Sequence, residues 1–180
     1  MKYLLILLLI FSFLKADKHA EFSKYLKIKD YQNACSVGKN IIISGEKNEK
    51  LISLIAKTCL KCDYIYGLSI AQHRLRKTKE ARSDAVAFSS IVLQKKLIYQ
   101  FMYDNTDIST FALPIVDHPL SHTFVAIRDK KYTLISENPK IIKFQHQKNV
   151  YKVFIDKYDK GRVIIEITDS NNNKERRRYI

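Results

Sequence analysis

The sequence YKVFIDKYDKGRVIIEI, residues 151–167, has the pattern of two β-strands joined by a tight turn. Gly161 supplies the positive φ that a short hairpin turn requires. Apolar residues recur at every second position on both sides of the turn, which places them on one face of each strand: Tyr151, Val153, Ile155, Val163, Ile165 and Ile167. This hairpin predicts an antiparallel sheet with one buried face.

The hairpin belongs to a longer series of short runs rich in β-branched and aromatic residues. These runs predict a meander of five or six antiparallel strands: residues 123–128, 131–136, 141–145, 151–155, 163–167 and 176–180. The first two runs would pair as a hairpin, and the charged last run suits a sheet edge. We assign residues 122–180 to this β region and residues 105–121 to a proline-marked connector.

The N-terminal half of the chain has a helical pattern. Residues 18–104 contain no proline, and apolar residues recur there every three or four positions. This period indicates amphipathic helices, and breaks near Asp30, Gly45 and Asp63 divide them into short segments. Thr78 is the expected N-cap of a long fifth helix. The region therefore predicts helical hairpins that end in one long helix.

Together these patterns predict an α+β fold. Residues 17–104 form the N-terminal helical hairpins plus one long helix, and the antiparallel β-meander follows. A sheet with one apolar face must be covered, and the long helix is the simplest element to cover it. We therefore expect the sheet and the long helix to pack as one unit.

The helical segments show an internal repeat. A shift of 33 residues aligns Asp30 with Asp63, Tyr31 with Tyr64, Ala34 with Gly67, and Gly38 with Ala71. With small residues at the expected helix crossings, residues 20–77 resemble the tetratricopeptide-like helical hairpin repeats. The resemblance implies paired helices that present a groove to a protein or peptide partner.

The N-terminus has the order of residues found in a secretory signal peptide. Lys2 gives a positive start, Tyr3 to Leu14 is an apolar run, and Ala16 precedes Asp17. As a helix this run spans about 18 Å, against about 30 Å of membrane hydrocarbon. We expect residues 1–16 to be a signal peptide cleaved between Ala16 and Asp17, which predicts a periplasmic or secreted protein. An uncleaved anchor or a buried strand is the alternative.

The composition is that of a basic globular protein. Hydrophobic residues make up 46% of the chain, which excludes disordered and low-complexity classes. The net charge of +14 falls to +12 when Lys2 and Lys15 leave with the signal peptide. Such a charge suits nucleic acid, anionic lipid or an acidic polymer. Export argues against nucleic acid, so we expect contact with an anionic cell-wall or membrane surface.

Three cysteines follow the signal segment: Cys35, Cys59 and Cys62. In an exported protein the default state of cysteine is a disulfide. Antiparallel helices could join Cys35 to Cys59, with Cys62 left as the odd thiol, while Cys59 and Cys62 also form a C-x-x-C pair. Asp63 stands where haem attachment needs histidine, and zinc would need two further ligands. We therefore expect no cofactor.

Two candidate sites involve histidine. A candidate metal site in the connector consists of Asp117, His118 and His122. Cys35, His122 and Asn138 occur in the order nucleophile, base and orienting residue. In this order they resemble cell-wall cysteine peptidases of the NlpC/P60 and CHAP type, which implies that Cys35 would attack and His122 would act as base.

The absence of a convincing catalytic set in the sequence favours a different function. We expect an exported, non-enzymatic interaction or scaffold protein that binds an unidentified protein or peptide partner. The alternative is a cell-wall cysteine peptidase that uses Cys35, His122 and Asn138.

Overall fold

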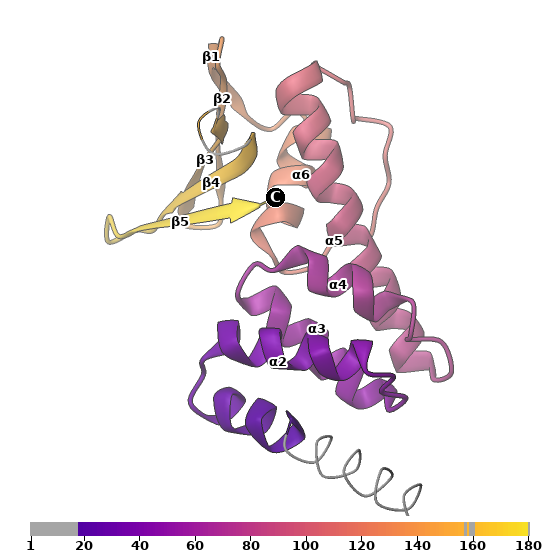
Figure 1. The fold of residues 1–180 in the computed structure, drawn as a ribbon. Helices are drawn as coiled ribbons and strands as arrows, with labels where there is room; N and C mark the ends of the chain where they lie inside the picture. The colour runs from indigo at the N-terminus through magenta and orange to yellow at the C-terminus, as the bar shows by residue number, and fades with distance from the viewer. Residues whose placement is uncertain (1–17, 157, 159–160, 180) are drawn as a thin grey trace, which may run out of the picture. The chain divides into compact units, whose positions relative to one another are not determined.

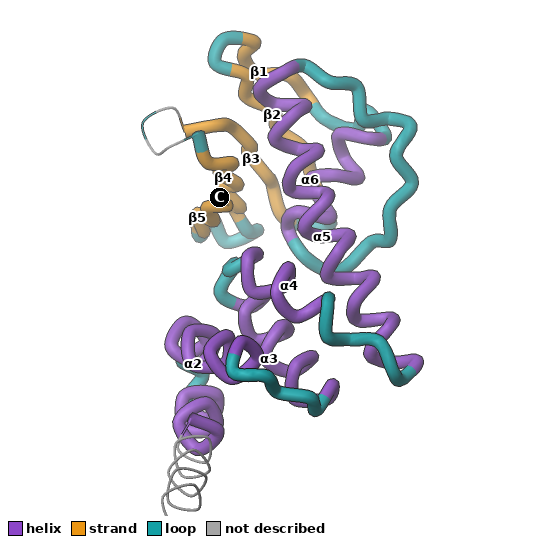
Figure 2. Tube along the Cα trace, turned by 45° about the vertical axis from the view of Figure 1, so that its right-hand side comes forward, coloured by secondary structure: helices purple, strands orange, loops and turns teal. Residues whose placement is uncertain are grey.

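The computed structural model describes residues 18–156, 158 and 161–179 (Figure 1). Helices come first along the chain and a five-stranded antiparallel sheet follows (Figure 2). This order confirms the predicted α+β fold class. The proposed signal peptide and its cleavage site at Ala16 and Asp17 lie outside the described residues. Within those residues, no helix combines the length and apolar character that crossing a membrane requires.

The described residues divide into two compact units, with the boundary between Phe88 and Ser89. The boundary falls inside the long helix α5, Lys79–Asp104, so each unit contains part of that helix. The first unit otherwise contains a helix over residues 18–27, α2 (Tyr31–Ile43), α3 (Glu49–Lys61) and α4 (Ile65–Gln72).

Local chemistry sets the ends of the helices in the first unit. The Asp30 side chain accepts a hydrogen bond from the Asn33 amide at 3.1 Å, and the Thr78 hydroxyl accepts one from the Ala81 amide at 3.1 Å. These contacts satisfy amides that the first helical turn leaves unpaired. Gly45 and Asp63 adopt positive φ just after α2 and α3. The predicted breaks and the predicted N-cap are therefore confirmed.

Small residues bring α3 close to both of its neighbours. A Cβ atom added to Gly38 would lie 2.6 Å from Cγ2 of Ile55, and one added to Gly67 would lie 2.8 Å from Sγ of Cys59. Ala34 and Ala71 are fully buried as well. The small positions that the 33-residue shift aligns are thus all buried, and they set how closely the hairpin helices approach.

The contact at Gly67 leads to a stability prediction. Alanine gains about 1 kcal/mol of helix propensity over glycine, but overpacking a filled contact costs about 1–3 kcal/mol. We expect Gly67→Ala to lower the free energy of unfolding by about 1 kcal/mol, measured by urea unfolding. Ser69→Ala on the same helix is the control and should change it little. A more stable Gly67→Ala variant would contradict this packing.

The second unit contains the rest of α5, the helix α6 and the sheet. Its elements are α6 (Pro119–Arg128), β1 (Thr133–Glu137), β2 (Lys140–His146), β3 (Asn149–Asp156), β4 (Arg162–Thr168) and β5 (Lys174–Tyr179). The strands lie in the order β1-β2-β3-β4-β5, and each pairs antiparallel with the next. The sheet is therefore the expected meander, with five strands in the described part of the chain.

The prediction that residues 123–128 form a strand is wrong. They belong to α6, which starts at Pro119 because the His118 side chain accepts a hydrogen bond from the Leu120 amide at 3.2 Å. The buried residues of this segment recur every three or four positions, as on one face of a helix: Leu120, Phe124 and Ile127. The connector consequently ends at His118, and β1 pairs with β2 instead of with residues 123–128.

Two helical segments contact the sheet and the connector in this unit. His118 and His122 of the α6 region make ring contacts with Tyr179 and Tyr151 on the sheet. In α5 the buried Gln94 donates to the Pro114 carbonyl at 2.9 Å and accepts a hydrogen bond from the Ser121 hydroxyl. The inner face of the sheet is thus covered in part by α6, a helix that the sequence pattern did not predict.

Candidate functional site

A disulfide joins Cys35 of α2 to Cys59 of α3, with an S–S distance of 2.04 Å. Both cysteines are almost fully buried between the helices. This is the pairing expected from antiparallel packing, and it confirms the disulfide prediction. In this state the sulfur of Cys35 is not a free nucleophile.

Cys62 is a free cysteine at the C-terminal end of α3. Its thiol donates to the Cys59 carbonyl at 3.3 Å. Burial raises the pKa of the Cys62 thiol above its ordinary value. Since the thiolate is the reactive form of cysteine, this environment lowers the reactivity of Cys62.

His122 is the centre of a polar cluster in the second unit. Its Nε2 lies 3.3 Å from Oδ1 of Asp117, and its Nδ1 lies 3.2 Å from the hydroxyl of Tyr151. Its ring stacks on that of His146, with 3.9 Å between the ring centroids. The cluster therefore brings together side chains from the connector, α6, β2 and β3.

The sheet register explains why His146 and Tyr151 join this cluster. Phe144 and His146 share one face of β2 because side chains alternate along a strand. Tyr151 of β3 lies opposite Phe144, and their rings stack with 4.8 Å between centroids. The sequence pattern predicted Tyr151 on the inner face, but it indicated no role for Tyr151 or His146. Ile142, Phe144 and His146 occupy every second position of β2, and this alternation could have predicted that His146 faces inward.

The environment favours uncharged forms of the central groups. Burial, followed by the charge of His146, lowers the pKa of His122, while the nearby Asp117 carboxylate opposes that shift. Burial also raises the pKa of Tyr151. A neutral imidazole between a hydroxyl and a carboxylate is therefore the favoured state at neutral pH.

The weak metal candidate is not assembled in this structure. Asp117 and His122 approach each other, but Nδ1 of His118 caps α6. Among the described residues, no group of three or more histidine, cysteine or acidic side chains is arranged to hold a metal ion.

The shifted pKa of His122 predicts a pH dependence of stability. Its folded-state pKa lies below the ordinary 6.5, so the unfolded chain binds the proton first as the pH falls. The free energy of unfolding should therefore decrease below about pH 6.5 and level off once the folded protein is protonated too. Urea unfolding across this pH range and an NMR titration of His122 measure the effect.

Replacing His146 tests the second cause of the lowered pKa of His122, the charge of the neighbouring ring, which acts in addition to burial. His146→Gln removes the neighbouring charge, so the pKa of His122 should rise toward its ordinary value and the loss of stability should shrink. His73→Gln, at an exposed position of the first unit, is the control and should leave the titration of His122 unchanged. A His122 pKa that is the same in all three proteins would contradict this explanation.

Asn138 lies away from His122. It sits in the turn between β1 and β2, two residues before Lys140, whereas His122 stacks on His146 at the other end of β2. At about 3.3 Å per residue, the two ends of β2 are roughly 20 Å apart. Cys35 belongs to the first unit and is bonded to Cys59. The structure therefore does not bring His122 and Asn138 together as a catalytic pair.

Asn138 instead lines a groove beside β1, which we call the β1 groove. Its volume is about 580 Å³, and it is lined by Phe101, Tyr103, Asn105, Tyr132, Leu134, Glu137, Asn138 and Lys140. The Phe101 and Tyr132 rings meet edge to face, with 5.5 Å between centroids. Lys140 Nζ lies 4.3 Å from the Phe101 ring centroid and donates to the Phe101 carbonyl at 3.1 Å.

The strand beside this groove has an open edge. Within the described residues β1 pairs with β2 and with no other strand. Leu134 is 43% exposed and Ile135 is 55% exposed, and the pairing with β2 is irregular between Leu134 and Ser136. An apolar edge strand with unpaired backbone groups is a site where another chain can add.

No protein-family model, curated protein or solved structure matches this chain. Its function is therefore inferred from its own chemistry. The β1 groove has a volume and an adjoining open strand edge, whereas the residues of the His122 cluster are engaged with one another. We take the β1 groove as the candidate functional site.

Proposed function

We propose that this is an exported, non-enzymatic interaction protein that binds an extended segment of a protein partner along β1. The observation that carries the proposal is the open apolar edge of β1 beside an aromatic groove. The expected signal peptide supports export, and the Cys35–Cys59 disulfide is compatible with an oxidising compartment. The proposal thus refines the scaffold function expected from the sequence.

The backbone of β1 supports a strand as the ligand. An added strand would pair with the outward N–H and C=O groups of β1, which supplies affinity without regard to sequence. Its alternate side chains would face the β1 groove, which supplies specificity. The recognition mode is therefore addition of a sixth strand at the β1 edge of the five-stranded sheet.

The walls of the β1 groove indicate which side chain the partner presents. Phe101, Tyr103 and Tyr132 form an aromatic wall, and a volume of about 580 Å³ accommodates a large side chain. Lys140 and Asn138 add donors at the same opening. We therefore expect the partner segment to carry an aromatic or large aliphatic residue next to an acceptor group.

Peptide selection tests this proposal. A library of random peptides is selected against the mature protein, and the enriched peptides are titrated against variants by calorimetry. Leu134→Lys places a charge on the open edge and should weaken binding at least about tenfold, since charged edge residues oppose strand addition. Ile28→Lys is the matched control, because Ile28 is 65% exposed in the first unit, and it should bind like the wild type.

Three outcomes would overturn the proposal. The selection could enrich no peptide, both variants could lose affinity equally, or Leu134→Lys could bind as tightly as wild type while its circular dichroism spectrum is unchanged. Pairing of two copies of the protein through β1, seen as a dimer that Leu134→Lys abolishes, would replace the partner peptide with a second copy of the chain.

A further inference from the structure

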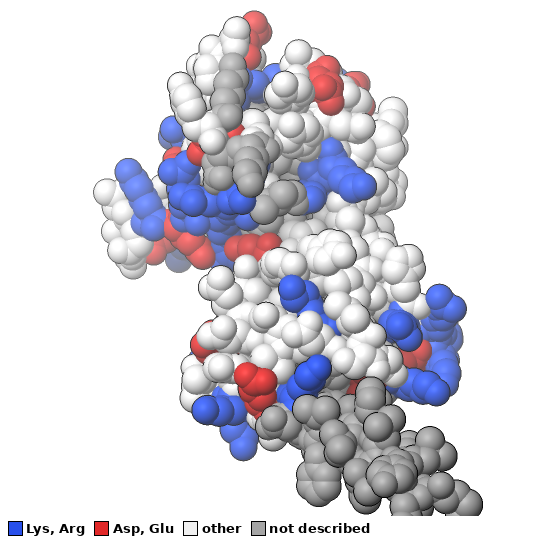
Figure 3. Space-filling model, viewed as in Figure 1, with Lys and Arg blue, Asp and Glu red and all other residues white. Residues whose placement is uncertain are grey.

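The outer face of the sheet is strongly basic. Side chains alternate along each strand, so the residues between the buried ones point away from α6. The charged members of this outer set are Lys143, Lys152, Arg162, Lys174, Arg176 and Arg178, with Asp156 and Glu166 as the acidic members. We call this set the basic sheet face. Figure 3 shows lysine and arginine side chains gathered over β4 and β5.

The positive charges lie along two lines. Lys143 and Lys152 are directly opposite each other on β2 and β3. Lys174, Arg176 and Arg178 alternate along the edge strand β5, at a spacing of about 6.6–6.8 Å. A linear array of charges fits a long, flexible polyanion better than a single compact anion, because successive charges of the ligand meet successive cations.

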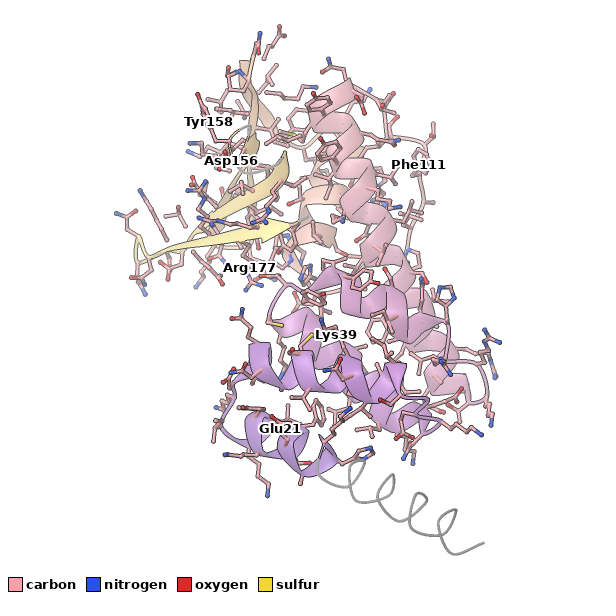
Figure 4. The ribbon with its side chains drawn as sticks, in the orientation of Figure 1. Glu21, Lys39, Phe111, Asp156, Tyr158 and Arg177 are labelled. Carbon is pink, nitrogen blue, oxygen red and sulfur yellow. A yellow bond between two sulfur atoms is a disulfide. The ribbon has the colours of Figure 1, made fainter. Side chains whose placement is uncertain are left out.

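Hydrogen-bond acceptors lie within the same surface. Arg176 pairs with Glu166 at 3.8 Å and with Asp156 at 3.3 Å. Asp156, labelled in Figure 4, lies at the end of β3. Carboxylates would repel a chain made only of phosphates, but they accept hydrogen bonds from hydroxyl groups. The mixture of cations and acceptors therefore suits a polymer that carries both acidic groups and hydroxyls.

The aromatic residue on this face is held between two cations. Lys152 Nζ lies 5.4 Å and the Arg176 guanidinium carbon 5.6 Å from the centroid of the Phe154 ring. The ring is therefore engaged by cations, whereas single-stranded nucleic acid needs open aromatic faces for its bases. The other apolar side chains of this face are half-buried or buried: Ile141, Val150 and Ile164. Insertion into a lipid surface would need such side chains to be exposed.

We propose that the basic sheet face binds a linear acidic polysaccharide. The carboxylates of the polymer would contact the lysine and arginine side chains along β5 and across β2 and β3. Its hydroxyl groups would donate to Asp156 and Glu166. This surface is formed by residues other than those of the β1 groove, so the inference stands independently of the proposed peptide partner.

The test measures binding of the mature protein to polygalacturonate, with neutral dextran as the uncharged comparison. Lys143→Glu combined with Lys174→Glu reverses two exposed charges on the basic sheet face. We expect at least about a tenfold loss of affinity at low salt and a weaker dependence of affinity on salt concentration. The control is Lys24→Glu combined with Lys27→Glu, which makes the same change of net charge on the helix over residues 18–27. Its affinity for polygalacturonate should fall by less than about twofold.

Each remaining outcome overturns the inference. An equal loss of affinity for polygalacturonate in both double variants would mean that net charge alone attracts the polymer. Binding of single-stranded DNA, or of vesicles rich in phosphatidylglycerol, as tight as that of polygalacturonate would mean that the face does not select a polysaccharide. Absence of binding at low salt would show that the basic sheet face is not a binding site for an acidic polysaccharide. Unchanged circular dichroism spectra and unchanged midpoints of urea unfolding show that the variants remain folded.

Discussion

Replacement of Phe124 by alanine is expected to lower the free energy of unfolding by about 3–5 kcal/mol. The Phe124 side chain is completely buried, on the face of α6 that packs inside the second unit. Truncation removes the apolar contacts of the ring and leaves a cavity that a close-packed interior fills only in part. Urea unfolding followed by circular dichroism measures the change.

Val125→Ala provides the matched control for this effect. Val125 is the next residue of α6 and is only half-buried, so its truncation should cost less than about 1 kcal/mol. The contrast between neighbouring positions reports which face of the helix is buried. A loss below about 1 kcal/mol for Phe124→Ala would contradict the position of α6 in the core.

The combined replacement of Cys35 and Cys59 by alanine is expected to cost about 3–4 kcal/mol. The disulfide closes a loop with a sequence separation of 24 residues, and that closure restricts the unfolded chain. Unfolding in urea without reductant measures the difference. Cys62→Ala is the control, and we expect it to change the free energy of unfolding by less than about 1 kcal/mol, because Cys62 lies outside the bridge.

The state of the cysteines in the cell checks the same prediction. Peptide mass spectrometry of protein alkylated before and after reduction should recover Cys35 bonded to Cys59, together with a mature N-terminus at Asp17. A free and rapidly alkylated Cys35 would contradict the bridge.

Local patterns were sufficient to predict most of the fold. The alternation around Gly161 identified β3 and β4, and the residues Asp30, Gly45 and Thr78 marked helix ends because capping and positive φ depend on near neighbours. Helix α6 was missed because Thr123 and Val125 are β-branched and favour strands locally. Burial of Phe124 against other elements outweighs that preference.

The candidate site was less predictable because it depends on contacts between distant residues. His122 was identified, but its neighbours His146 and Tyr151 come from strands whose register the sequence does not state. The order of Cys35, His122 and Asn138 along the chain carried no information on their separation in space. Asn138 proved to line the β1 groove.

Hydrogen exchange at the backbone amides of β1 tests the central claim most directly. Exchange is measured by mass spectrometry on the mature protein, alone and saturated with a peptide from the selection. Strand addition predicts slower exchange within Thr133–Glu137, at the amides that point away from β2, because the added chain pairs with the open edge. Unchanged exchange throughout Thr133–Glu137, with protection elsewhere in the protein, would contradict the proposed function.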